Sequence, residues 1–394
     1  MTVLTDRMKA EAAPVWSMAF RPFFLAAGLW SAVALALWIA LYLSGAPWPS
    51  RFDPLSWHIH AMLFGFVPAA IAGFLLTAIA NWTGRRPIQG AVLSGLAVLW
   101  LLGRIAVLVS ALLPFWVAPA VDLAFPVILC VLAVREIVAA RNWRNLMMPV
   151  PIAVLGLADL LMFLENGGVR IPEGLGWRLA IAAIIALVSA IGGRIIPTFT
   201  RNWLAKRGTG SLPARHRLVD SMALATLHTG VLGWAFLPTS KPIGVLLLFG
   251  AALNIWRLAS WRGWRAMREP LLTILHLGYG WIILGAGLLG ASMITPTIPL
   301  AAAVHAFTAG AMGTMILAVM TRVSRGHTGR PLEADSWTVL IYALVNAAAV
   351  ARVIAPFTWA VSTALVVSSA TLWVASFVLF LIAYGPMLVQ PRRG

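Results

Sequence analysis

The sequence has few charged residues and a single cysteine. Only 10% of its 394 residues are charged and 61% are hydrophobic, so a soluble fold would lack the polar side chains that cover a water-exposed surface. Cys130 is the only cysteine, which excludes intrachain disulfides, cysteine-rich zinc sites and iron–sulfur clusters held by cysteines. Any bound metal would therefore be held mainly by histidine, methionine or oxygen ligands.

Several motifs of soluble enzymes are also missing. The chain has no GxxxxGK[ST] phosphate loop and no glycine-rich turn after a strand, and nothing supports a serine or cysteine triad. The net charge is +17, but the cations lie in short loops rather than on one folded face, so we expect no nucleic-acid partner. The first residues, MTVLTDRMKAEAAP, lack the pattern of a cleavable signal peptide. We therefore expect the first membrane helix to drive insertion.

Long apolar runs make up most of the chain. Each has about 20 residues, the length that a helix needs to cross roughly 30 Å of hydrocarbon, and none alternates as the strands of a membrane barrel do. We predict an all-α integral membrane protein, one polytopic membrane domain over 1–394, with about twelve transmembrane helices in the lipid bilayer. The predicted spans are 23–43, 55–79, 92–112, 118–138, 149–166, 178–197, 219–238, 243–260, 271–291, 299–320, 337–356 and 360–385.

The loops between these runs alternate in charge. Cytoplasmic loops of membrane proteins carry an excess of Lys and Arg, and here the loops after the even-numbered spans are basic, whereas the others carry only Arg51, Arg170 and Lys241. The pattern predicts a multi-pass protein of the bacterial inner membrane with both termini in the cytoplasm. The basic loops contain Arg85, Arg86, Arg135, Arg141, Arg144, Arg201, Lys206, Arg207, Arg215, Arg217, Arg257, Arg262, Arg265, Arg268, Arg322, Arg325 and Arg330.

Three span endings resemble one another and start 121 residues apart. They read GFLLTAIANWTGRRP (73–87), RIIPTFTRNWLAKRG (194–208) and MILAVMTRVSRGHTG (315–329). The spacing predicts three four-helix repeats over about 20–140, 141–261 and 262–385. Such repeats would form a pseudo-threefold bundle like the catalytic subunit of haem–copper oxidases, an analogy of fold and not of function. Alternatively, interfacial helix ends share Arg, Thr and Trp without any repeat.

Two histidines lie near the outer end of span two, in FDPLSWHIHAMLFGF. Asp53 suits the helix N-cap and Pro54 its first turn. His58 and His60 are two residues apart, which on a helix is about 200° of rotation. We therefore expect them to serve two different sites, one on each side of the helix. The alternative is an interfacial pair bonded to loops or water.

His305 lies in span ten at a depth similar to that of His60, counted at 1.5 Å per residue from Pro299 and Pro54. Equal depth is what two axial ligands of one haem require. We predict that His60 and His305 ligate haem, and that His58 and His276 belong to a second metal or haem. The small residues after His305 could leave space for a flat macrocycle or allow close helix packing.

Ionisable residues inside membrane spans are costly and are candidates for function. Tyr279 lies one turn from His276 and could supply a phenol. Arg104 and Asp159 are each about halfway through a span and could pair with each other. Alternatively, Arg104 could bind a propionate or another anion, and Asp159 could relay protons. We take Tyr279 and Asp159 as the catalytic candidates.

The remaining polar residues have simpler explanations available. Arg194 could extend its charge to the interface or, beside Gly192 and Gly193, approach a flat ligand. His327 lies in a basic loop and is expected to be exposed or to bind an anion. We expect His216 at the surface and His228 either at a cofactor or bonded to a carbonyl. The weaker candidates are Asp122, Glu165, Asn346 and Arg352.

The motifs that carry these residues resemble those of the NnrS family of bacterial membrane proteins. The matching stretches are FRPFFLAAGLW, DPLSWHIHAMLFGF, IAGFLLTAIANWTGRRP, GGRIIPTFTRNWL, LHLGYGWIILG and AVHAFTAGAMGTMILAVMTRVSRGHTGRPL, between residue 20 and about 331. The family usually has HxHEM, but this chain has Ala61 at the position of the glutamate and lacks that carboxylate. By motif, the resemblance implies metal ligation by five histidines: His58, His60, His276, His305 and His327.

The resemblance implies a haem- and copper-containing protein linked to nitric oxide metabolism, denitrification or nitrosative-stress defence. Our leading hypothesis is a redox enzyme, such as a nitric oxide reductase, that uses one or two haem b groups and possible copper with a quinol or cytochrome as electron donor. A second hypothesis is a haem-based sensor or scavenger that binds nitric oxide without turnover. A third is a transporter of metal complexes derived from nitric oxide, against which parallel repeats argue.

Overall fold

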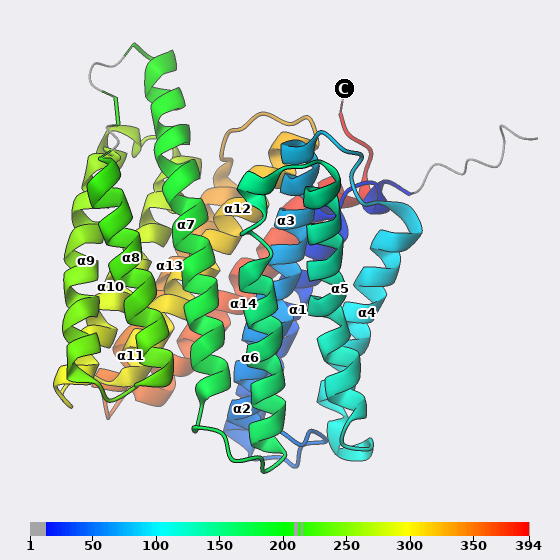
Figure 1. The fold of residues 1–394 in the computed structure, drawn as a ribbon, viewed down its shortest axis with the longest axis vertical. Helices are drawn as coiled ribbons and strands as arrows, with labels where there is room; N and C mark the ends of the chain where they lie inside the picture. The colour runs from blue at the N-terminus through cyan, green and yellow to red at the C-terminus, as the bar shows by residue number, and fades with distance from the viewer. Residues whose placement is uncertain (1–12, 209–211, 214–215, 394) are drawn as a thin grey trace, which may run out of the picture.

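The protein is a bundle of long helices. A computed structural model describes residues 13–208, 212–213 and 216–393, and every regular element among them is helical. The long helices run side by side along the vertical axis of Figure 1. They are α1 (Phe20–Ser44), α2 (Pro54–His60), α3 (Val67–Thr83), α4 (Gly90–Leu108), α5 (Val117–Ala139), α6 (Val150–Asn166), α7 (Leu175–Lys206), α8 (Arg217–Phe236), α9 (Lys241–Ser260), α10 (Pro270–Ile294), α11 (Leu300–His305), α12 (Gly313–His327), α13 (Ser336–Ile354) and α14 (Ser362–Val389).

The prediction of about twelve membrane helices is confirmed in its main point. Each predicted span overlaps one helical rod, because α2 and α3 form one continuous rod and so do α11 and α12. Among the described residues, eleven rods are long and apolar enough to cross a membrane. The remaining rod, α8, packs against α7 and α9 but carries polar residues such as Asp220 and His228, which lower its hydropathy.

The two described ends of the chain lie together at one end of the bundle (Figure 1). Arg21, in the first turn of α1, donates hydrogen bonds to the carbonyl oxygens of Leu388 at 3.0 Å and Gln390 at 2.6 Å. Two ends on the same side require an even number of membrane crossings. Counting α8 as a crossing raises the eleven apolar rods to twelve. The cytoplasmic position of that side stays a prediction, and its residues 1–12 and Arg215 lie outside the described residues.

Two rods change helical type directly after a histidine. His60 is followed by a π-helical segment, η3 (Ala61–Phe66), and His305 by another, η7 (Ala306–Met312). π-helical turns inside α-helices occur frequently at functional sites. The indole N–H of Trp30 donates to the Ala61 carbonyl at 2.9 Å. These segments lie in spans two and ten, while the three predicted repeats stay a prediction.

Candidate functional site

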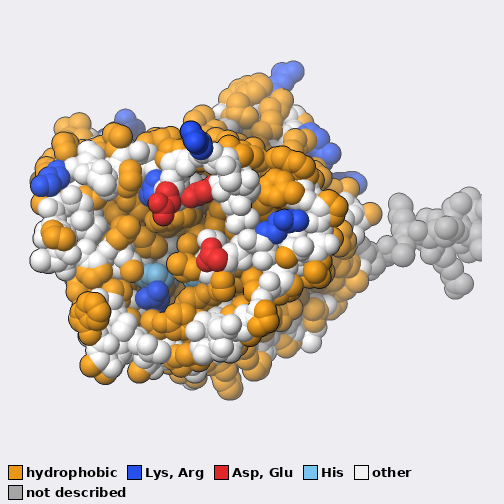
Figure 2. Space-filling view, turned by 90° about the horizontal axis from the view of Figure 1, so that it is seen from below, with side chains coloured by type: hydrophobic (Ala, Val, Ile, Leu, Met, Phe, Trp, Pro, Cys, Tyr) orange, Lys and Arg blue, Asp and Glu red, His pale blue; other side chains and the backbone are white. Residues whose placement is uncertain are grey.

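A cavity of about 380 Å³ lies between α1, α2, α7, α11, α13 and α14. It adjoins the end of the bundle opposite to the described termini, since its wall includes Leu55 and Leu300 from the first turns of α2 and α11. Figure 2 shows that this face is hollowed, with mostly hydrophobic walls and with histidine and cationic side chains visible inside. The cavity is therefore an apolar chamber that contains a few polar groups.

His58 of α2 is one of two histidines in the cavity wall. Its ring stacks on Trp38 of α1, with 4.3 Å between ring centroids and an interplanar angle of 27°. Its Nδ1 atom is buried, and no described residue forms a hydrogen bond with it. A buried polar nitrogen without a partner is costly in an apolar surrounding, so His58 is a candidate ligand for a group bound in the cavity.

His305 of α11 is the second histidine in this wall. Its Nδ1 lies 2.7 Å from the carbonyl oxygen of Ala301, so in the neutral ring Nδ1 donates a proton and Nε2 keeps its lone pair. Histidines that ligate metals are held in this way, with one nitrogen bonded to a carbonyl and the other directed to the metal. The local structure therefore leaves His305 ready to act as a ligand.

Arg352 of α13 lines the same cavity. Its guanidinium has no hydrogen bond or ion pair with any residue in the described part of the chain. A cation in an apolar wall is stabilised by an anionic partner. Arg352 is therefore placed to bind a carboxylate or another anionic group of a ligand near His58 and His305.

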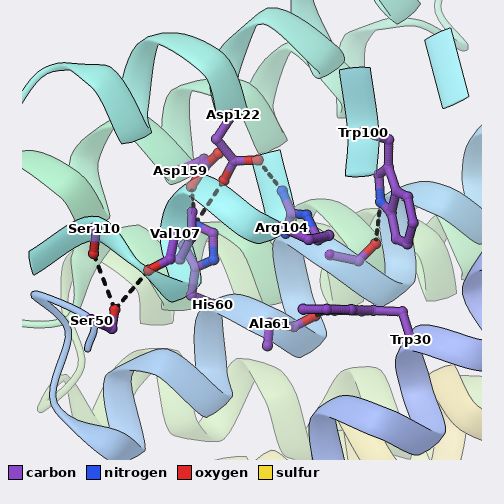
Figure 3. A network of polar contacts seen from close by, with 11 residues as sticks. Trp30, Ser50, His60, Ala61, Trp100, Arg104, Val107, Ser110, Asp122 and Asp159 are labelled. Carbon is purple, nitrogen blue, oxygen red and sulfur yellow. Dashed lines mark hydrogen bonds and ion pairs between the residues drawn. The ribbon is translucent and has the colours of Figure 1, made fainter. Parts of the chain in front are cut away.

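His60 lies on the other side of the same helix, in a buried cluster of charged residues (Figure 3). Its Nε2 donates to Asp159 Oδ1 of α6 at 2.9 Å and lies 3.1 Å from Asp122 Oδ2 of α5. Asp122 also accepts an ion-pair hydrogen bond from Arg104 of α4. All four side chains are almost completely buried, so the cluster links α2 to three neighbouring helices.

The cluster has the atoms for a metal ion but not the charge balance. The donor atoms of His60, Asp122 and Asp159 lie within 4.8 Å of one another. With Arg104 the group carries one net negative charge, which a protonated imidazole would balance and a divalent ion would overcompensate. An ion would also have to replace the hydrogen bond between His60 and Asp159. We therefore assign no metal to this cluster.

The family model described as NnrS protein matches residues 14–392, nearly the whole chain. The chain belongs to the NnrS family. Membership suggests a haem- or metal-containing membrane protein related to nitric oxide. No curated protein matches the chain.

Haem, which NnrS membership suggests, fits the cavity better than any other described place. The cavity offers two histidines on different helices, one with an unpartnered buried nitrogen and one with its lone pair left available. Arg352 could bind a propionate, and the apolar wall suits a macrocycle. The cluster around His60 offers no comparable space, because the adjoining void beside Asp122 measures about 10 Å³.

The structure therefore groups the NnrS histidines differently from the sequence-based prediction. His60 and His305 were predicted to share one haem, but they do not line one cavity, and His58 takes the place beside His305. Arg104 was considered as a partner of Asp159, whereas its ion pair is with Asp122. Arg352 and Asp122, ranked as weaker candidates, are central to the two sites. The sequence signal for both residues was their position inside predicted membrane spans, where ionisable side chains are costly.

The other predicted ligands of this NnrS protein lie toward the end of the bundle that holds the described termini. His276 of α10 bonds the Leu272 carbonyl through Nδ1 at 3.0 Å. Tyr279 is fully buried, donates to Asn254 Oδ1 at 2.6 Å and accepts from Arg257. These contacts join α9 and α10 and contain no member of the cavity wall. A catalytic role for Tyr279 therefore has no support from the geometry.

Three further residues are also outside the cavity wall. Arg194 is exposed on α7, as expected for a charge at the interface. The His327 ring lies 5.5 Å from the Phe20 ring, centroid to centroid, and is half-buried rather than exposed. His228 bonds the Ser189 hydroxyl at 2.8 Å, whereas a cofactor or a carbonyl was expected as its partner.

Proposed function

We propose that this protein binds haem b in the cavity through His58 and His305 and acts on nitric oxide as a membrane redox enzyme. The observation that supports the proposal is the pair of histidines on separate helices in one apolar chamber of a chain from the NnrS family. Neutral imidazole is a common ligand of haem iron. When bound, the haem would supply the electron transfer, and it would bind nitric oxide once one of the two histidines is displaced.

The residues of the chain have distinct parts in this proposal. The Ala301 carbonyl keeps the proton of His305 on Nδ1, so that Nε2 can bind iron. Trp38 stacks on His58 and limits the rotation of its ring. Arg352 binds an anionic substituent of the haem. Nitric oxide is small and apolar and reaches such a chamber through the bilayer without a water channel.

The proposed reaction is reduction of nitric oxide to N₂O, which consumes electrons and protons. A quinol or a cytochrome is the electron donor in this proposal. Copper stays a prediction of that resemblance, because the described residues hold no second group of histidines with an adjoining cavity. The proposal therefore rests on one haem cavity.

One observation favours a second candidate function. The described residues of the cavity wall include no Asp or Glu, and Ala61 stands where the family usually has a carboxylate. A cavity wall without a carboxylate suits a sensor or scavenger that binds nitric oxide without turnover. Consumption of nitric oxide by the purified protein with a reductant would favour the enzyme, and stoichiometric binding alone would favour the sensor.

The test of the haem site uses the full-length protein purified in detergent. We expect His58→Ala and His305→Ala to lower the ratio of haem to protein and to shift the Soret band. His228→Ala is the matched control, because His228 is also a partly buried histidine inside the bundle but does not line the cavity. Unchanged haem content and spectra in both His58→Ala and His305→Ala would refute the site.

A further inference from the structure

The rod that carries His58 changes its helical type close to this residue. α2 has seven residues, Pro54–His60, and then changes to the π-helical segment η3. A π-helical turn changes the direction of the side chains after it relative to those before it. Contacts from other helices must therefore hold His58 toward the cavity.

His60 provides such a contact on the side of α2 opposite to the cavity. Its ring is fully buried among Phe52, Phe64 and Phe163, with ring centroids 5.2 to 5.3 Å away. The hydrogen bond to Asp159 attaches it to α6. Since His58 and His60 are about 200° apart on the helix, holding His60 on one side directs His58 to the other.

Asp122 and Arg104 extend this attachment to α5 and α4. Asp122 Oδ2 lies 3.1 Å from His60 Nε2, and Asp122 Oδ1 accepts from Arg104. The close approach of α4 and α5 depends on Gly103, where an added Cβ would lie 2.6 Å from Asp122 Oδ1. Trp100, on the same helix, donates to the Gly65 carbonyl in η3 at 3.0 Å (Figure 3).

We propose that Asp159, Asp122 and Arg104 are positioning residues that act through His60 to direct His58 into the cavity. None of the three lines the cavity, so none touches the bound group. The inference rests on the proposed function, because it assigns His58 to the haem. It adds that α4, α5 and α6, which do not line the cavity, determine the ligation of a haem bound among other helices.

The test compares Asp159→Ala with Asp159→Asn in the full-length protein with haem bound. The asparagine side chain keeps an oxygen that can accept from His60, whereas alanine removes it. We expect Asp159→Ala to shift the ferric haem spectrum from six-coordinate toward five-coordinate, as His58→Ala does, and added imidazole to restore it. Asp159→Asn should keep the wild-type spectrum. A purely structural loss would not be rescued by imidazole.

The matched control is Glu136→Ala. It removes a buried carboxylate of α5 that lies outside the cluster and is paired with Arg85 and Arg135. Its spectrum should equal that of the wild type. If Asp159→Ala does not fold, Gly103→Ala takes its place, because it displaces Asp122 while every charged residue of the cluster stays. Gly103→Ala should shift the ferric haem spectrum toward five-coordinate, but less than Asp159→Ala.

Two results would overturn the positioning role. One is a wild-type haem spectrum in folded Asp159→Ala or Gly103→Ala, while His58→Ala alters it; the haem site would then stand and only the positioning role would fail. The other is a stoichiometric metal ion that Asp159→Ala removes, which would make the cluster a metal site. If His58→Ala leaves the spectrum unchanged, the haem assignment itself fails and the positioning role falls with it.

Discussion

The two sides of α2 differ in how their polar groups are partnered. On one side, the Nε2 atom of His60 contacts two carboxylates and Asp122 is paired with Arg104, although the Nδ1 atom of His60 is also buried without a hydrogen bond. On the other side, Arg352 has no partner among the described residues, and the Nδ1 atom of His58 is buried without a hydrogen bond. Paired charges in a bilayer stabilise the fold, whereas unpaired groups beside a void indicate a ligand.

The largest loss of stability is expected on the paired side. Asp122→Ala leaves Arg104 buried without its carboxylate, and removing one partner of a buried ion pair costs about 3–5 kcal/mol. Thermal unfolding in detergent, followed by circular dichroism, measures the loss. Asp220→Ala, which removes a partly exposed partner of Arg257, should cost less. Equal losses would show that burial of the pair does not decide stability.

On the side of α2 that faces the cavity, a substitution should remove haem but cost little stability. His305→Ala removes a ligand but breaks only one hydrogen bond to a backbone carbonyl, so we expect loss of haem with a loss in the stability of haem-free protein of about 1 kcal/mol. Haem content and the thermal midpoint of the haem-free protein are measured together. A stability loss as large as that of Asp122→Ala would remove the distinction between the two sides.

Substitution of Arg352 should weaken haem binding without changing the stability of the haem-free protein. Arg352→Met keeps an apolar stem but removes the charge, and a hydrogen bond to a charged group contributes about 1.5–3 kcal/mol. Haem retention during dilution should fall at least about tenfold, with Arg352→Lys less affected. Because the guanidinium has no protein partner, the haem-free protein should not be destabilised. A destabilised haem-free variant would show an unseen structural partner.

The smallest effect is expected outside the membrane, at Asp335. This residue caps α13 and accepts from Thr338 and Arg325. Although partial burial alone would raise it, these contacts hold the pKa of Asp335 below its ordinary value. Its contribution to stability is therefore complete above the ordinary carboxyl pKa and is lost as the pH falls through the lowered one. Asp335→Ala should cost about 1 kcal/mol at neutral pH.

The pH dependence provides the check for this last prediction. The difference in thermal midpoint between the wild type and Asp335→Ala should shrink on acidification. Thr358→Ala, at another helix end on the protein surface, serves as the comparison, since it removes no carboxylate. A difference that stays constant with pH would show that the cap does not act through its charge.

Some of the site could be predicted from the sequence because it depends on local geometry. The opposite directions of His58 and His60 follow from helical rotation, and the structure places them in two different sites. The partner of His305 could not be predicted in the same way. Depth along a helix gives no information about which face of that helix meets a neighbour, so His60 was chosen where His58 lines the cavity.

The partner of Arg104 shows the same limit. Asp122 and Asp159 both lie inside spans, and the sequence cannot tell which carboxylate reaches the guanidinium. Gly103 decides it, because the absence of a side chain there lets Asp122 approach α4. The fold was also needed to assign α8 as a membrane crossing, because the hydropathy of α8 alone does not identify it as a span.

By itself, the sequence determined the helical membrane fold, the family and the residues able to bind a metal, because length, hydropathy and residue type are local properties. Only the tertiary structure decided that His58, His305 and Arg352 share a cavity while His60 joins Asp122 and Asp159. Those groupings depend on the rotation and packing of helices far apart in the chain, which no local pattern specifies.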